Sequence, residues 1–182
     1  PLIIFSPKSL LRHKESVSPL EEFANDKFNP VNEDWDSREI DPEKVERVIF
    51  CSGKVYYDLR NERRIRAIPN LPLVRIAQIY PFAHEEFRAQ IVRYKNAKEI
   101  VWCQEEPRNQ GSWRHIQHYL MRHLLPHQKL YYAGRDSSAS PAAGYKSLHE
   151  KQQKELVNQA LTMAGGSEPR LSKPRPLAEG EE

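Results

Sequence analysis

Short apolar runs separated by longer polar stretches extend along the chain. The runs are each four residues long and lie at residues 2–5, 48–51, 73–76, 100–103 and 130–133. Apolar runs of this length between polar stretches are typical of buried strands. We therefore expect strands of a mostly parallel sheet at these positions.

Helical spacing appears between the predicted strands. In residues 84–94 and 113–124 the apolar positions recur every three or four residues, which places them on one face of a helix. These positions are Phe87, Ile91, Tyr94, Trp113, Ile116, Leu120 and Leu124. Because strand and helix alternate, the predicted fold class is α/β: a three-layer sandwich whose mostly parallel sheet is flanked by helices, with right-handed crossovers.

Helix starts and loops are also marked in the sequence. Ser18-Pro19-Leu20-Glu21 and Ser147-Leu148-His149-Glu150 each offer a hydroxyl cap and a carboxylate three residues later. The second string predicts a final helix through about Leu161. Residues 25–43 are polar and turn-rich and predict a loop. The last sixteen residues contain three prolines and no aromatic residue, so we expect a domain over residues 1–164 and a disordered tail over residues 165–182.

The composition narrows the class of protein. Hydrophobic residues make up 38% and charged residues 29% of the 182 residues, which is typical of one globular domain. No apolar run approaches the roughly 18 residues that a membrane helix needs. The 28 basic and 25 acidic residues give a net charge of +3, which is too close to balance to indicate nucleic-acid binding. The chain enters an apolar run directly after Pro1, which suggests a segment of a longer protein.

The two cysteines, Cys51 and Cys103, lie inside β-branched and aromatic runs. A free thiol in such a run behaves as a small buried hydrophobe. We see no secretory signal, which fits a reducing compartment. We therefore expect two structural thiols and no disulfide.

Two stretches follow predicted strands with residues that can hold a ligand. Cys51-Ser52-Gly53-Lys54 brings backbone amides and a lysine to a strand end, where an anion can bind; the alternative is a tight turn with a solvated lysine. It lacks the second glycine of a P-loop. Gln104-Glu105-Glu106-Pro107 lies at another strand end, where ligands and partner domains meet an open α/β sheet. Since neighbouring strand residues point apart, we expect Glu105 and Glu106 to serve an interface or a helix cap and not catalysis.

Two further sets of polar residues, the arginines of one predicted helix and a series of histidines, are not expected to bind a ligand. Four arginines alternate with two acids on one predicted helix, which is typical of a solvated face with internal ion pairs. They are Arg60, Arg63, Arg64 and Arg66, with Asp58 and Glu62. The histidines at 115, 118, 123 and 127 do not form a helical zinc site, because Pro126 ends the helix before the last of them. We expect no metal ligand among them.

Five strings then resemble, in order and spacing, the carboxy-terminal region of 2-oxoglutarate dehydrogenase first components. They begin at Ser6-Pro7-Lys8-Ser9-Leu10-Leu11-Arg12-His13 and Cys51-Ser52-Gly53-Lys54-Val55-Tyr56-Tyr57-Asp58-Leu59, and continue with Trp102-Cys103-Gln104-Glu105-Glu106-Pro107, Asn109-Gln110-Gly111 and Tyr132-Ala133-Gly134-Arg135. The resemblance spans about residues 1–161. Ala77 departs from the family, which usually carries glutamate there.

The resemblance implies a domain similar to the carboxy-terminal domain of transketolase-type enzymes, structural and regulatory and not catalytic by itself. The full enzyme that it resembles decarboxylates 2-oxoglutarate on thiamine diphosphate with magnesium and passes the succinyl group to the lipoyl arm of a succinyltransferase component. The cofactor would be bound by the remaining domains, in a homodimer, in a bacterial cytoplasm or a mitochondrial matrix. The alternatives are a free-standing acyl-CoA or nucleotide-binding module and the same domain of a 2-oxoadipate dehydrogenase.

One edge of the predicted sheet is expected to be an allosteric pocket for acetyl-CoA or AMP. The site comprises Ser6, Cys51, Lys54, Gln104, Gly111 and Ser112. Lys54 and the amides of a helix start suit a phosphate, while the other polar side chains suit a base or an amide. The resemblance adds that actinobacterial relatives respond to acetyl-CoA, although the position of their ligand-binding arginine falls near Glu21. We also expect an apolar surface for neighbouring domains near Trp102 and Trp113, unless both fill the core.

Overall fold

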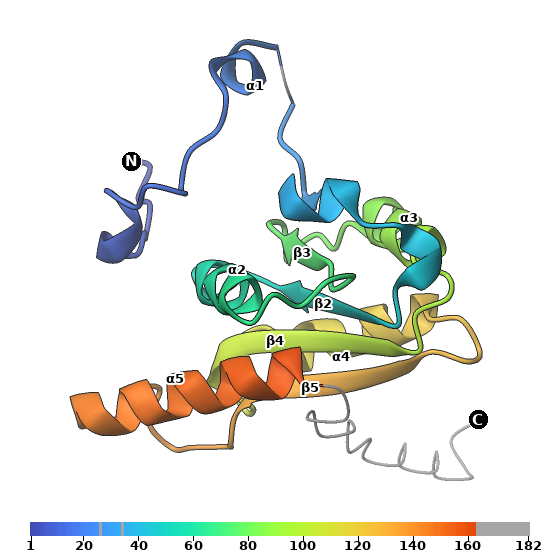
Figure 1. Cartoon of the computed structure of the whole chain (residues 1–182). Helices are drawn as coiled ribbons and strands as arrows, with labels where there is room; N and C mark the ends of the chain where they lie inside the picture. Colours follow the sequence, from blue (N-terminus) through green and yellow to red (C-terminus); the bar gives the residue numbers. More distant parts are fainter. Residues whose placement is uncertain (26, 34, 163–182) are drawn as a thin grey trace, which may run out of the picture.

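The computed structural model describes residues 1–25, 27–33 and 35–162 and contains one sheet with helices on both faces (Figure 1). Its strands are β1 (Val31–Glu33), β2 (Arg47–Cys51), β3 (Leu73–Ile76), β4 (Glu99–Pro107) and β5 (Lys129–Arg135). Its α-helices are α1 (Leu20–Asn25), α2 (Val55–Ile65), α3 (His84–Arg93), α4 (Trp113–His123) and α5 (Lys146–Leu161). Three short 3-10 helices, η1 (Lys8–Leu10), η2 (Trp35–Glu39) and η3 (Pro42–Lys44), precede β2.

The five strands lie in the order β1-β3-β2-β4-β5. Strands β2 to β5 are parallel to their neighbours, and β1 pairs with β3 in the antiparallel sense. From β2 the chain moves to β3 on one side, then crosses back to β4 on the other. The carboxyl ends of β2 and β4 therefore flank the point where the strand order reverses, which is where open α/β sheets leave a crevice. The predicted α/β class and four of the five predicted strands are confirmed.

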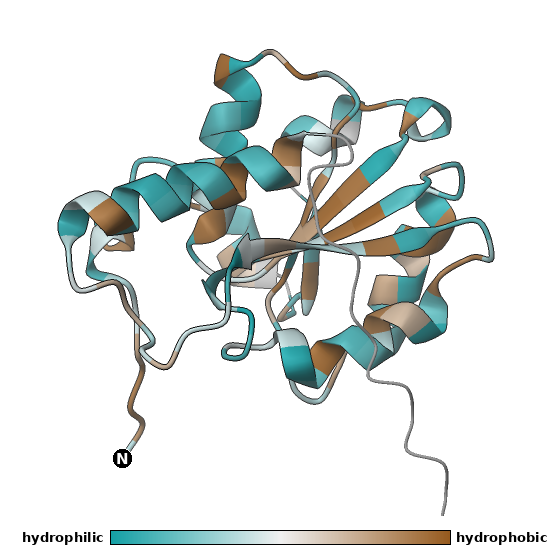
Figure 2. Ribbon diagram, turned by 90° about the horizontal axis from the view of Figure 1, so that it is seen from below, coloured by the Kyte–Doolittle hydropathy of each residue, from teal (hydrophilic) through white to brown (hydrophobic). Residues whose placement is uncertain are grey.

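Alternating residues of the central strands contribute to two separate cores. On β2, Val48 and Phe50 pack with α3 and α4, whereas Ile49 and Cys51 pack with α2 and α5. This alternation follows from the pleat of a strand, because neighbouring side chains point to opposite faces. The apolar colouring in Figure 2 is accordingly concentrated on the strands and on the helix faces turned toward them.

The predicted strand at residues 2–5 is wrong. These residues form no strand and are highly exposed, with Phe5 96% accessible. They belong to an amino-terminal arm that extends away from the sheet (Figure 1). The predicted loop at residues 25–43 instead supplies β1, whose backbone pairs Val31 with Ile76 and closes that edge of the sheet.

Other boundaries differ in detail. Helix α5 begins at Lys146, so Ser147 lies inside it, and its N-cap Tyr145 makes no side-chain cap. The predicted capping box is therefore wrong, although the helix ends at Leu161 as predicted. Trp102 and Trp113 are both buried in the core formed with α3 and α4, so the alternative that they fill the core is confirmed and their placement on an exposed surface is wrong. The predicted tail at 165–182 lies outside the described residues.

Candidate functional site

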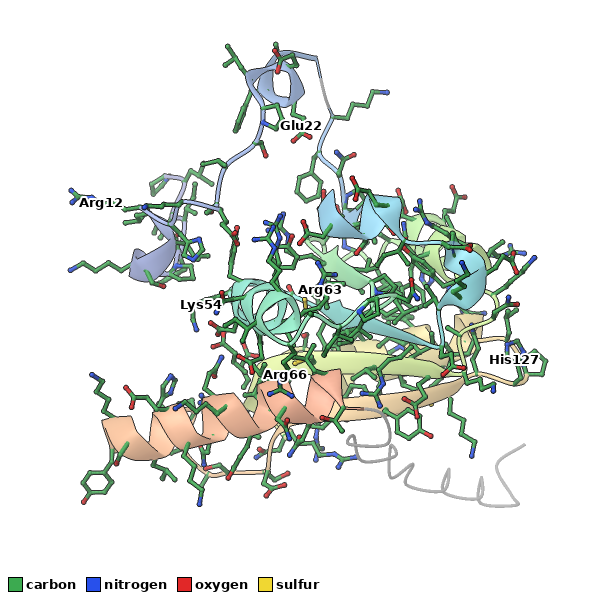
Figure 3. The ribbon with its side chains drawn as sticks, viewed as in Figure 1. Arg12, Glu22, Lys54, Arg63, Arg66 and His127 are labelled. Atoms are coloured by element: carbon green, nitrogen blue, oxygen red, sulfur yellow. The ribbon has the colours of Figure 1, made fainter. Side chains whose placement is uncertain are left out.

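The carboxyl ends of β2 and β4 bring together two of the motifs singled out in the sequence. Lys54 is the N-cap residue of α2, directly after β2, and Glu105 lies on β4. Their side chains form a salt bridge. Figure 3 places Lys54 at the start of α2, on the side of the amino-terminal segment. Lys54 is therefore paired with a carboxylate of the neighbouring strand and is not simply solvated.

A glutamine extends this pair into a polar network that reaches two further elements, β5 and α5. Gln153 of α5 donates from its amide nitrogen to Asp58 Oδ2 at 2.7 Å and to Glu105 Oε1 at 2.9 Å. Arg135 at the end of β5 donates to the Gln153 oxygen at 3.0 Å. The network thus joins α2, β4, β5 and α5. Its carboxylates are hydrogen-bonded to an amide or paired with Lys54, an arrangement that stabilises the contact between these elements.

Gln104 serves as a cap for α4. Its side-chain oxygen accepts hydrogen bonds from the Trp113 backbone N–H and from the Trp102 indole, each at 3.0 Å. Its amide nitrogen donates to the Gln110 carbonyl at 2.9 Å. The glutamine is buried and fully used by these contacts. Glycine is required nearby, because Gly111 has a φ of +64° and a Cβ there would approach the Glu106 Cβ to 2.9 Å.

Five of the six residues predicted for the allosteric pocket lie at this end of the sheet, but only some are accessible. Lys54 and Ser112 are half-buried, whereas Cys51 and Gln104 are buried. Ser6 lies on the exposed arm and does not close a strand. One amide at the start of α4, that of Trp113, is already bonded to Gln104. The pocket stays a prediction, and a phosphate there would have to compete with Glu105 for Lys54.

Cys51 and Cys103 form no disulfide and are buried in register on adjacent strands. Burial, and then the neighbouring Cys51, raise the pKa of the Cys103 thiol well above its ordinary value. A thiol held in the neutral form is a poor nucleophile. The prediction of structural thiols is confirmed.

The arginines of α2 are not the solvated face that was predicted. Arg60 and Arg63 are buried, and Figure 3 shows Arg63 on the side of α2 that faces the body of the molecule. Asp36 of η2 binds three of the arginines, with Oδ2 at 3.0 Å from Arg63 Nη2 and at 2.8 Å from Arg64 Nε. Arg66, the C-cap residue of α2, forms an ion pair with Glu62 of the same helix at 2.8 Å.

Asp36 is a residue that sequence reasoning missed. The Arg64 hydrogen bond is the main cause that holds the pKa of its carboxyl group well below the ordinary range. Glu15 adds a second carboxylate to the cluster by pairing with Arg64 and Arg60. Neither acid is close to α2 in the sequence, so no helical spacing could have indicated the contact. Together they fasten η2 and the amino-terminal segment to α2, beside a cavity of about 330 Å³.

Two of the four histidines singled out in the sequence, His123 and His127, make polar contacts with other parts of the chain. His84 Nδ1 lies 2.9 Å from His123 Nε2, joining the start of α3 to the end of α4. Burial, and then the charge of His84, lower the pKa of His123. His127 Nε2 lies 2.8 Å from the Lys95 carbonyl. Within residues 1–25, 27–33 and 35–162, no three His, Cys, Asp or Glu side chains are placed to hold a metal ion.

Comparison with known proteins places the sequence in one family. Residues 17–161 match the family described as 2-oxoglutarate dehydrogenase C-terminal. The chain belongs to this family. The resemblance predicted from the five strings is therefore confirmed. In this chain, Gln104 of β4 caps α4, and Lys54 after β2 pairs with Glu105 of β4.

Individual relatives agree with the family match. The chain is 50% identical over 166 residues to the 2-oxoglutarate dehydrogenase E1 component of Cupriavidus necator, covering 91% of this chain and 17% of that protein. The proteins of the same name from Azotobacter vinelandii and Haemophilus influenzae are 49% and 50% identical, over 90% and 89% of this chain. The chain thus spans about 17% of the length of these relatives. No helix in the described part of the chain is long and apolar enough to cross a membrane.

Proposed function

We propose that this chain acts as the carboxy-terminal domain of a 2-oxoglutarate dehydrogenase first component. The proposal rests on one observation: the chain is about 50% identical in sequence to proteins of that name over about 90% of its length. The whole enzyme would decarboxylate 2-oxoglutarate and pass the succinyl group to a lipoyl-bearing succinyltransferase in the tricarboxylic acid cycle. The bacterial relatives support a bacterial cytoplasm as its location. They are named for oxoglutarate, which favours this substrate over 2-oxoadipate.

The domain itself would be structural and would leave thiamine diphosphate and magnesium to the remaining domains. The donors at the carboxyl end of its sheet do not fit a magnesium diphosphate. Glu105 pairs with Lys54, and Asp58 accepts a hydrogen bond from Gln153. Magnesium diphosphate sites need carboxylates that are free to bind the metal. The cofactor would supply the carbanion-stabilising chemistry when it is bound outside this segment.

Calorimetric titration of the 182-residue chain with thiamine diphosphate and magnesium tests this assignment. We expect no binding tighter than about 10 μM, which corresponds to roughly −7 kcal/mol. A full-length enzyme that contains this segment is the positive control and should bind the cofactor. Tight binding by the isolated chain would place the cofactor site in this domain and would contradict the proposal.

We also propose that Lys54 and the neighbouring predicted residues form an acetyl-CoA or AMP pocket that is gated by Glu105. Its position at the reversal of strand order supports it, because ligands of open α/β sheets bind there. Acetyl-CoA and AMP are titrated at fixed low salt, where phosphate contacts are least screened. Glu105→Gln should free Lys54 and strengthen binding, and Lys54→Ala should weaken it. If both variants bind as the wild type does, or nothing binds at millimolar ligand, the pocket is not used.

A further inference from the structure

A second cavity lies at the carboxyl end of β5, below the loop that leads to α5. Its volume is about 240 Å³. Arg135 and Asp136 at the strand end, Ser138 and Ser140 of the loop, and Leu148 of α5 contribute to its lining. None of the six residues predicted for the allosteric pocket lines it. The cavity is therefore distinct from the site at β2 and β4.

The loop over this cavity is held in one conformation by two side chains from the β4–α4 connection. The Asn109 amide nitrogen donates to the Ser138 carbonyl at 2.9 Å, and the Ser138 N–H donates to the Asn109 oxygen at 3.0 Å. The Gln110 amide nitrogen donates to the same carbonyl at 2.9 Å. Within the loop, the Ser140 N–H donates to Ser138 Oγ at 3.2 Å. These bonds preform the cavity, so a ligand would not have to order the loop on binding.

Arg135, the cation that lines the cavity, contacts an amide oxygen and an imidazole nitrogen. Arg135 is half-buried, and its Nη2 donates to Gln153 Oε1 at 3.0 Å and lies 3.1 Å from His149 Nδ1. Within the described ranges no carboxylate lies within 4.0 Å of this guanidinium, and its buried Nε has no acceptor. A partly buried charge without a counter-charge is costly. The planar guanidinium matches the oxygens of carboxylates and phosphates.

Two groups near Arg135 change the electrostatic potential that a bound anion would meet: the amino end of α5 and the Asp136 carboxylate. The first turn of the sixteen-residue helix α5 has no acidic residue and no side-chain cap, so its N–H groups add positive potential near Leu148. Asp136 lines the cavity as well and is exposed. The negative charge of the Asp136 carboxylate would repel an anion in the cavity. Substituting Asp136 therefore tests the site while Arg135 stays in place.

We propose that this cavity is a binding site for the carboxylate or phosphate group of a small molecule, with Arg135 as its principal charged contact. The bound oxygens would supply the counter-charge that Arg135 lacks. The volume lies below the roughly 300 Å³ of the smallest drug-sized pockets, which suits a small anion and not a nucleotide. The inference does not depend on the proposed function, because it uses only the contacts of this chain.

The site is tested by nuclear magnetic resonance of the ¹⁵N-labelled 182-residue chain, titrated separately with inorganic phosphate and with succinate. Potassium chloride at matched ionic strength controls for screening. We expect saturable shifts of the amides of residues 138–144. Arg135→Gln should weaken binding by about tenfold or more, since charge-assisted bonds are lost. Arg114→Gln, an exposed arginine of α4 outside the cavity, should bind as the wild type does. The anion that binds tighter identifies the group preferred.

Asp136→Asn keeps every contact of Arg135 and should tighten binding several-fold, by removing the opposing charge. If Arg135→Gln fails to fold, which circular dichroism would detect, Asp136→Asn still tests the site. Three results would overturn the proposal: shifts no larger than those with chloride, equal affinity in Arg135→Gln and wild type, or no gain in Asp136→Asn.

Discussion

Single residues at the carboxyl end of the sheet are fixed by contacts that leave no room for a larger side chain. Gly134 of β5 shows this most clearly. A Cβ built there would lie 2.5 Å from the Tyr132 hydroxyl oxygen, 2.7 Å from the adjacent ring carbon and 3.0 Å from the Gln104 carbonyl oxygen. Tyr132 cannot yield easily, because its ring is buried and packs against Trp113 with centroids 5.0 Å apart. The glycine in the Tyr-Ala-Gly-Arg string is thus needed for packing.

Gly134→Ala should therefore lower the free energy of unfolding by about 1 to 3 kcal/mol, the usual cost of overpacking a core. Gly144→Ala is the matched control, since a Cβ at Gly144 meets no atom within 4 Å. That change should be neutral or stabilise by up to about 1 kcal/mol through the unfolded state. Urea denaturation of both variants measures the two effects. Equal stability of the two variants would show that the Tyr132 ring moves aside at no cost.

Whole elements are joined by charged side chains that reach across the fold. Arg47, on β2, is buried and donates to the Ala160 carbonyl at 2.7 Å, which satisfies the carboxyl end of α5. Its Nε also donates to Glu99 on β4 at 2.6 Å. Asp36 acts similarly between η2 and α2. The sequence predicts the helices and strands themselves, because their apolar faces are periodic, but it does not predict these contacts, because each joins residues far apart in the chain.

The cluster around Asp36 makes the stability of the chain depend on pH. Its pKa is lower in the folded chain than in the unfolded chain, where it is about 3.9. The unfolded state therefore takes up a proton first as pH falls. The stabilisation of the folded chain by the ionised Asp36 carboxylate is fully present above about pH 5 and is lost progressively at lower pH.

Asp36→Asn should consequently be less stable than the wild type at pH 7, and the difference should shrink as pH falls below about 4. Urea denaturation of both proteins across this range measures it. Glu150→Gln is the control, because its partner Lys146 is 90% exposed and such pairs contribute little. A difference between Asp36→Asn and wild type that stays constant down to pH 3 would assign the effect to lost packing and not to charge.

At the scale of the molecule, the sequence predicts the sheet because buried parallel strands are apolar throughout. The same rule fails for residues 2–5, which are as apolar as a strand but have no neighbouring strand. It also fails for β1, whose three residues Val31–Glu33 are mostly polar and are held by backbone pairing with β3. The candidate site was predictable as a position, from strand ends. The partners of Lys54 and Gln104 were not, because they depend on tertiary packing.

The amino-terminal segment carries most of the exposed large apolar side chains of the described chain. They are Leu2, Ile3, Ile4, Phe5, Leu11, Val17, Leu20, Phe23 and Phe28. In Figure 2 the apolar colour continues along the segment next to the amino terminus. Contiguous apolar surface of this kind usually marks a contact with another protein surface. The proposed function supplies such a surface, since the other domains of a first component would cover the arm.

Without those domains, the 182-residue chain should associate with itself through the arm, because association is the remaining way to remove these side chains from water. Sedimentation velocity over about two decades of concentration should show a rising sedimentation coefficient. Replacing residues 2–5 by serine should abolish the rise, while the fold persists because these residues belong to neither core. Val92→Ser removes an exposed apolar residue of α3 instead and should associate as the wild type does. A chain that stays monomeric at every concentration would show that the arm does not mediate self-association. Loss of association in Val92→Ser would show that α3 forms the contact instead.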